Sequence, residues 1–202
     1  KETQLIPGSE KAKPDELTEK VKATDDNDAG NFGPGNKHVY ILSNEVSSNV
    51  VLAYRRASNG TLTFSTSYTT GGTGTGGGLG NQGAVIIDEG RRILLAVNPG
   101  SNSISSFKIT ANGDELSLKS TVPSGGMRPV SITVHGNIVY VLNAGGNGNI
   151  SGFKLNNNNQ LTAIPNSTRP LSSTTAGAAQ ISFVNNGKVV AITEKATNKI
   201  IT

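Results

Sequence analysis

The sequence predicts an all-β fold that is built from a repeated unit of short strands. Apolar residues make up 34% of the 202 residues and fall mostly into short runs of Val, Ile and Leu, with one Met and no Trp. Turn-forming segments rich in Gly, Asn and Ser separate these runs, and no segment keeps a helical apolar period over any length. Short strands joined by tight turns are therefore expected across the body of the chain.

The repeat is the strongest signal in the sequence and begins after residue 36. Each copy contains an apolar run that ends in an amide or acidic residue, followed by a short turn and a second apolar run. The equivalent end residues are Asn44, Asn98, Asn143 and Glu194, which lie 54, 45 and 51 residues apart. The second copy shows all four expected strands, at 83–88, 92–98, 104–110 and 116–122. Units of this length and content are typical of propeller blades, so the expected architecture is a β-propeller of four-stranded antiparallel blades.

The chain contains about three and a half such blades. The units run approximately over 37–79, 80–126, 127–173 and 174–202, after a polar tail or linker at 1–36. The first unit lacks an obvious innermost strand, and the last unit ends as its third strand begins. A propeller ring closes in order to remove exposed strand edges. The expected partner is therefore the set of remaining blades, from a longer chain or from a second chain.

Charge is distributed unevenly between the tail and the body. Residues 1–36 carry five Lys and eight acidic residues, whereas residues 37–202 carry thirteen Lys and Arg and six acidic residues. A basic body suits anionic ligands. The cations are dispersed in the sequence and aromatic residues amount to only 4%, which argues against nucleic acid as a partner.

Membrane, metal and cofactor signals are weak. No apolar run approaches the length of a membrane span, and the absence of cysteine suits an exported protein as well as a cytosolic one. We expect export to the periplasm, the cell surface or the medium, although no signal sequence is visible. Residues 25–28 resemble the start of a calcium loop, but Asn36 stands where the closing Glu is required. His38 and His135 form no zinc pattern, and His135 is predicted to lie in a turn at the rim opposite the site described below. No metal or cofactor is expected.

Three segments share a more specific pattern. They read GRRILLAVNPGSNSISSFKIT, SGGMRPVSITVHGNIVYVLNAGGNGNISGFKL and NNGKVVAITEKATNKI, and each places an apolar strand, then an Asn or Glu, then a turn and a further strand. Over residues 37–202 this pattern resembles the lactonase family of seven-bladed propellers, which includes 6-phosphogluconolactonase and the fungal-type carboxymuconate lactonising enzyme. The resemblance implies a small-molecule site on one rim of the ring.

The candidate site follows from the alternation of strand direction. First strands begin, and second strands end, at the same rim of the propeller. Ligand-binding candidates at this rim are Gln82, Asn98, Asn143, Gln180, Lys195, Asn44 and Glu45. Amides and cations in this arrangement suit an anionic, oxygen-rich ligand that is small or derived from a sugar.

The catalytic set implied by the resemblance is largely missing from this half of the ring. The family's pattern of Gly-Pro-Arg-His, followed by Asn-Glu, corresponds here to Gly-Ala-Ala-Gln at 177–180 and to Glu194 one position early. Glu194 and Arg128 are the remaining catalytic candidates. Two functions therefore stay open: a relative of lactone hydrolases with altered or lost catalysis, and a non-enzymatic scaffold for binding or protein interaction at the cell surface.

The stretch GGTGTGGGLG at 71–80 contains a formal Gly-x-Gly-x-x-Gly motif. A dinucleotide fingerprint must open a helix, whereas the residues that follow this stretch read as a strand. We therefore predict an enlarged, mobile connector between blades at the ligand rim rather than a phosphate-binding loop.

Overall fold

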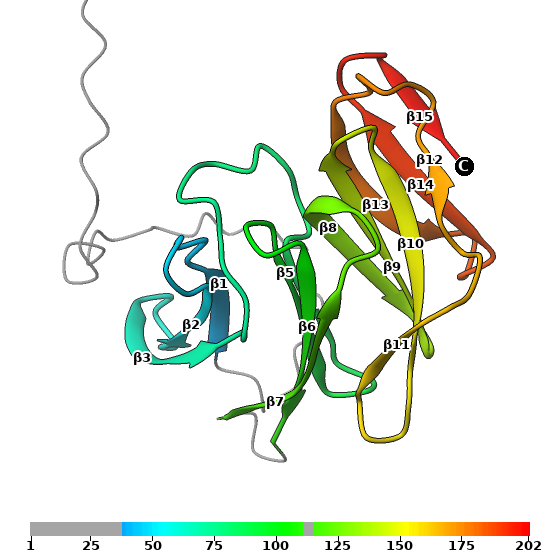
Figure 1. The fold of residues 1–202 in the computed structure, drawn as a ribbon. Helices are drawn as coiled ribbons and strands as arrows, with labels where there is room; N and C mark the ends of the chain where they lie inside the picture. Colours follow the sequence, from blue (N-terminus) through cyan, green and yellow to red (C-terminus); the bar gives the residue numbers. More distant parts are fainter. Residues whose placement is uncertain (1–37, 111–114) are drawn as a thin grey trace, which may run out of the picture.

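The computed structural model describes residues 38–110 and 115–202, and the expected tail at 1–36 lies outside this range. Every regular element in the described residues is a β-strand, and the strands form four antiparallel sheets arranged in an arc (Figure 1). The expectation of an all-β fold of antiparallel blades is confirmed. We number the sheets as blades 1 to 4 in chain order.

The four sheets differ in how many strands they contain. Blade 1 has three strands in the order β1 (His38–Leu42), β2 (Val50–Arg56) and β3 (Leu62–Thr69). Blade 2 has four, β4 (Val85–Asp88), β5 (Ile93–Asn98), β6 (Ser103–Ile109) and β7 (Leu116–Pro123). Blade 3 contains β8 (Met127–His135), β9 (Ile138–Gly145), β10 (Asn149–Leu155), β11 (Leu161–Ala163) and β12 (Arg169–Pro170), and both of the last two pair with β10. Blade 4 contains β13 (Ala178–Val184), β14 (Val189–Glu194) and β15 (Lys199–Ile201).

The strand register supports the repeat that was read from the sequence. Asn98 pairs with Ser103, Asn143 pairs with Asn149, and Glu194 pairs with Lys199, so each is the same position in its own blade. In blade 1 the ladder continues past β1, where the N–H of Ser43 donates to the Val50 carbonyl. Strand β1 is therefore equivalent to β5, β9 and β14, and no strand among the described residues takes the innermost place of blade 1.

The core lies between blades rather than within them. All six residues of β5 are buried because alternate side chains pack against opposite neighbours. Ile93 and Leu95 join the cluster shared with blade 3, whereas Leu94 joins the cluster shared with Val51 of blade 1. Burial of each such side chain contributes about 1.5–3 kcal/mol. This two-sided burial explains why the strand reads as a continuous apolar run rather than as an alternating one.

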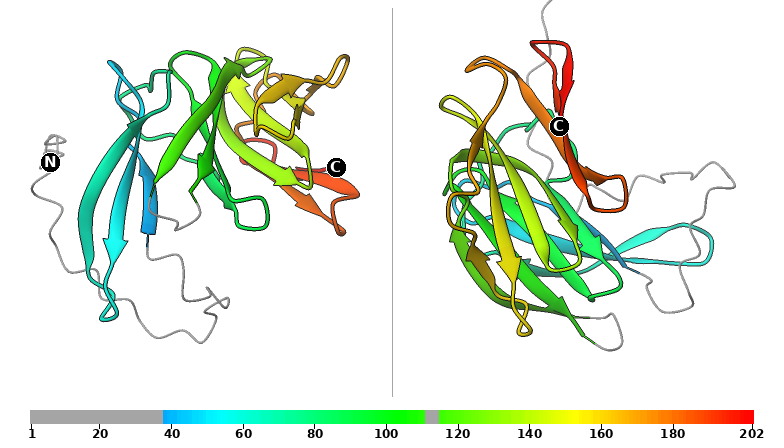
Figure 2. Two further views of the ribbon diagram at one scale, coloured as in Figure 1. Left: turned by 90° about the horizontal axis from the view of Figure 1, so that it is seen from below. Right: turned by 90° about the vertical axis from the view of Figure 1, so that its right-hand side faces the viewer.

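The arc is open at both ends, as the two further views show (Figure 2). Strand β14 has only two buried residues, and Ile200 of β15 is 73% exposed. In β5, by contrast, both faces are covered. The chain is a partial propeller whose ring needs further blades to close.

Candidate functional site

The two ends of the blades carry different loops. The starts of β4, β8 and β13 and the ends of β5, β9 and β14 lie at one end, which we call the upper rim, and the connector 71–80 runs along it at the top of Figure 1. The turns that join β4 to β5, β8 to β9 and β13 to β14 lie at the other end, together with the β10–β11 turn. We call that end the lower face.

Two hydrogen bonds join three blades at the upper rim. The side-chain amide of Asn81 donates to the backbone oxygen of Val130, which links blade 2 to blade 3. The Lys195 ammonium of blade 4 donates to the Gly80 carbonyl at 2.7 Å. The rim thereby brings together the neighbourhoods of Gln82, Arg128 and Lys195, all three of which have exposed side chains.

Arg128 has an unusual backbone conformation. Its φ is 52°, in the left-handed region that residues other than Gly, Asn and Asp rarely adopt. Its N–H donates to the Asn102 side-chain oxygen at 2.7 Å, which holds this conformation. The guanidinium group is exposed and makes no hydrogen bond or ion pair with any described residue. The backbone of Arg128 is therefore strained, and its side chain exposes a positive charge to solvent.

Two of the candidate amides are enclosed by protein. Asn98 and Asn143 are fully buried. Asn98 accepts a hydrogen bond from Asn49 of blade 1 and donates to Ser103 and Ser105 within 3.2 Å. Asn143 donates to the Ser124 carbonyl at 3.2 Å and to the Asn149 side chain at 2.8 Å. A ligand reaches neither amide without displacing these contacts, and their ligand-binding role stays a prediction.

Asn44 and Glu45 lie where blade 1 meets the connector. The Asn44 amide donates to Thr75 Oγ1 at 3.0 Å and to the Gly77 carbonyl at 2.6 Å, and its oxygen accepts from the Thr75 N–H at 3.0 Å. The Glu45 backbone oxygen accepts from the Gly74 N–H at 2.7 Å, and the Glu45 side chain is exposed. Asn44 therefore anchors the connector, whereas the Glu45 carboxylate is free to contact a ligand.

The connector is held more firmly than the sequence suggests. A Cβ at Gly74 would lie 2.1 Å from the Asn44 backbone, and a Cβ at Gly72 would lie 2.5 Å from the Asn98 side chain. Glycine is required here because the backbone passes closely between blades 1 and 2. A Cβ at Gly77 or Gly78 would have no atom within 4 Å. The mobility predicted for the connector is therefore confined to this second part of it, around Gly77 and Gly78.

Glu194 is the buried carboxylate of the rim and is only 2% exposed. It accepts hydrogen bonds from the Ser172 N–H at 2.9 Å, from the Ser172 hydroxyl, and from Thr197 Oγ1 at 2.5 Å. Burial acts to raise the pKa of Glu194, but these three hydrogen bonds and the charge of Lys199 hold the pKa below its usual range. A carboxylate of lowered pKa is a weak base at neutral pH, so the catalytic role of Glu194 stays a prediction.

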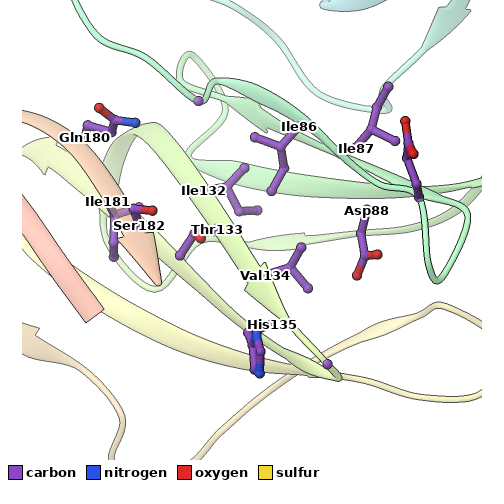
Figure 3. A pocket seen from close by; sticks show the side chains of 13 residues that line it. Ile86, Ile87, Asp88, Ile132, Thr133, Val134, His135, Gln180, Ile181 and Ser182 are labelled. Atoms are coloured by element: carbon purple, nitrogen blue, oxygen red, sulfur yellow. The ribbon is translucent and has the colours of Figure 1, made fainter. Parts of the chain in front are cut away.

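A groove follows the innermost strands away from the rim. It has a volume of about 510 Å³ and is lined by β4, β8 and β13 (Figure 3). Gln180 lies at the end near the rim, and Asp88 and His135 lie toward the lower face, where the sequence had placed His135. Ile132 and Ile181 line the wall between them. Ile132 and Ile181 are almost fully buried, so the accessible lining of the groove is mostly polar.

Sequence reasoning missed the residues that support the site. Asn102 holds Arg128, and Asn49 holds Asn98. The available signal was position, because Asn49 and Asn102 both lie in the turn that follows an equivalent end-of-strand residue. Within the described residues no group of three or more His, Asp or Glu side chains could hold a metal ion, and no helix is long and apolar enough to cross a bilayer.

Comparison with known proteins decides the family. Residues 29–167 match the family model for lactonase, 7-bladed β-propeller. The chain belongs to this lactonase family. A search of curated proteins gives no significant match.

Solved structures support the same fold. A proposed 6-phosphogluconolactonase from Bacteroides fragilis has a TM-score of 0.64 and 18% identity, and the match covers 84% of this chain and 50% of that one. A second, from Bacteroides uniformis, has a TM-score of 0.63 and 16% identity over 82% of this chain and 49% of that one. The periplasmic gluconolactonase of Pseudomonas aeruginosa has a TM-score of 0.50 and 19% identity over 68% of this chain and 36% of that one. The chain spans about half the length of the first two lactonase-family structures.

Proposed function

We propose that this chain forms part of a lactonase-family propeller whose upper rim binds a small anionic ligand derived from a sugar. The observation that carries the proposal is the free guanidinium of Arg128 on a left-handed backbone. A conformation of this kind costs about 1–3 kcal/mol and persists where the surrounding structure enforces it, commonly at functional sites. Arg is suited to recognise a carboxylate or phosphate through two parallel hydrogen bonds.

Other residues at the upper rim suit an oxygen-rich ligand. Lys195 supplies a second cation, and Gln82 and Gln180 supply amides that donate and accept. Ile86 and Ile87 of β4 are partly exposed and offer a small apolar surface that the carbon face of a sugar lactone would contact. Glu45 would contact only hydroxyl groups, since its charge opposes an anion.

Catalysis in this half of the ring is altered or lost under this proposal. The family resemblance implies Arg and His at positions that are Ala179 and Gln180 in this chain. An amide can orient a lactone but cannot take up a proton. Glu194 is enclosed and already accepts three hydrogen bonds. Any acid–base residue for ring opening would come from the blades that complete the ring.

The partner that completes the propeller is proposed to be the rest of the lactonase ring, in the same polypeptide or in a second one. The open faces of blades 1 and 4 and the half-length match to lactonase-family structures support this. Export is proposed by analogy alone, since one neighbour is described as periplasmic. Family membership favours a ligand-binding rim over a scaffold without a small-molecule site.

The test is calorimetric titration of the chain with 6-phosphogluconate, with glucose as the uncharged control. We expect the anion alone to bind, and Arg128→Gln to weaken binding about tenfold, which corresponds to one lost charge-assisted contact. Arg169→Gln is the matched control, because its guanidinium donates only to the Asn166 and Thr168 carbonyls. Equal affinity for both sugars, or an unchanged affinity in Arg128→Gln, would contradict the proposal. Hydrolysis of 6-phosphogluconolactone by the completed ring then tests catalysis separately.

A further inference from the structure

The fold gathers cations on the lower face that are dispersed in the sequence. Seven of the twelve Lys and Arg residues in the described ranges lie there, at Arg55, Arg56, Arg91, Arg92, Lys108, Lys154 and Lys188. Three acidic residues of the same ranges lie there too, at Asp88, Glu89 and Glu115. The rest of the described residues carry five cations and two acidic residues. More than half of the described cations therefore lie at one end of the blades.

The repeat explains how this concentration arises. Lys108 pairs with Ile93 and Lys154 pairs with Ile138, so the two lysines occupy the same position in blades 2 and 3, next to the lower turn. Arg56 ends the equivalent strand of blade 1. Arg91 and Lys188 lie in the turns between the first and second strands of blades 2 and 4. Each blade in the arc thus contributes at least one cation to the lower face.

Most of the cations on the lower face have no hydrogen-bond or ion-pair partner among the described residues. Arg55, Arg56, Lys108, Lys154 and Lys188 are exposed and make no hydrogen bond or ion pair with another residue that the structure describes. Asp88 accepts from the Arg91 backbone N–H at 3.1 Å and forms no ion pair with these cations, and the three acidic residues of the face are outnumbered by its seven cations. An array of unpaired cations on one face attracts polyanions and gives binding that depends on salt.

We propose that the lower face binds a linear anionic polysaccharide. The cations come from the turns and strand ends of all four blades, so an extended chain with repeated carboxylate or sulfate groups engages more of them than a single small anion does. Each exposed pair contributes little, and only several together give useful affinity. This site is separate from the ligand rim, and it does not depend on the function proposed above.

The surface disfavours the two other common polyanions. Single-stranded nucleic acid binds through exposed aromatic platforms. Among the described Phe and Tyr side chains only Phe64 is exposed, and it packs edge-on against Tyr54 at 5.7 Å. A membrane surface site usually adds an apolar face that inserts among the lipids, and the lower face presents only scattered apolar groups such as Val184.

The experiment compares two triple variants that remove the same charge. Binding to immobilised polygalacturonate is measured at low and at physiological salt for the chain, for Lys108→Gln/Lys154→Gln/Lys188→Gln, and for Lys119→Gln/Arg169→Gln/Lys199→Gln. We expect the first variant to lose about tenfold in affinity and the second to stay within about twofold. Thermal unfolding checks that both variants fold. Equal losses in the two variants, no binding at all, or tighter binding to single-stranded DNA or anionic vesicles than to the polysaccharide would each overturn the proposal.

Discussion

Lys195 Nζ lies 2.7 Å from the backbone oxygen of Gly80, although the two residues are 115 positions apart. Gly80 precedes the innermost strand of blade 2, and Lys195 follows the second strand of blade 4. The contact therefore spans blade 3 and fixes the far end of the glycine connector. The near end is fixed by Asn44, so only the glycines between them lack close neighbours.

Lys195→Met should free the end of the connector. Loss of the ammonium removes the side-chain hydrogen bond to the Gly80 carbonyl, while the apolar stem of the side chain is kept. We expect amide hydrogen exchange at residues 77–80 to become faster, with exchange in β14 unchanged. Glu45→Gln is the control, since its exposed side chain makes no hydrogen bond or ion pair with a described residue. Unchanged exchange at 77–80 would show that Lys195 does not hold the connector.

The two parts of the connector should respond differently to a single methyl group. Gly74→Ala places a Cβ 2.1 Å from the Asn44 backbone, whereas Gly77→Ala places it in open space. We expect the free energy of unfolding to fall by about 1–3 kcal/mol in Gly74→Ala, because the backbone of two blades must move. Gly77→Ala should change it by less than about 0.5 kcal/mol. Chemical denaturation of both variants checks the difference, and equal effects would contradict the close approach.

The blade pattern could be predicted from the sequence because it rests on local signals. Alternation of apolar runs and turns placed the strands of blade 2 within one or two residues of β4 to β7. The equivalence of Asn98, Asn143 and Glu194 could be read from spacing alone, and the register agrees. These signals need no knowledge of how one blade contacts the next.

The site was harder to predict because burial depends on the neighbouring blade. Asn98 looks like a rim amide in the sequence, but Asn49 of the preceding blade covers it and bonds to it. The connector looks mobile because it is rich in glycine, yet the glycines allow its close passage between two blades. Cations that are far apart in the sequence meet on one face only after the repeat is folded.

Asn98→Ala should destabilise the fold much more than Asn44→Ala, although the two residues are equivalent in the repeat. Asn98 is fully buried, and its removal deletes three buried side-chain hydrogen bonds, to Asn49, Ser103 and Ser105. We expect a loss of about 2–4 kcal/mol, because the lost hydrogen bonds add to the cost of the cavity left behind. Asn44 is half-exposed, and its loss should cost about 1 kcal/mol. Denaturant midpoints of the two variants provide the comparison. Similar midpoints would show that the buried hydrogen bonds of Asn98 do not stabilise the fold more than the exposed ones of Asn44.

Glu194 should make the stability of the protein sensitive to acid. Its pKa is lowered in the folded state, so the ionised carboxylate adds stability above the unfolded pKa of about 4.3. That stability is lost as the pH falls through the lower folded pKa. Glu194→Gln should be less stable at pH 7 by about 1–3 kcal/mol, because an amide cannot accept all three donors, and its acid transition should be shallower. Unfolding measured from pH 7 to pH 3 tests this, with Glu45→Gln as the exposed control. An unchanged acid profile in Glu194→Gln would assign the sensitivity to another group.

Arg128 should show a separation between stability and binding. Asn tolerates a left-handed backbone, so Arg128→Asn should keep or slightly raise the free energy of unfolding while removing the guanidinium. Val has a branched Cβ that opposes this conformation, so Arg128→Val should lower the free energy of unfolding by about 1–2 kcal/mol. Both variants should lose affinity for 6-phosphogluconate to the same extent, because neither carries the cation. Thermal denaturation and titration of the two variants separate the effects: equal stabilities would show that the backbone is not strained, and retained affinity in Arg128→Asn would remove Arg128 from the ligand site.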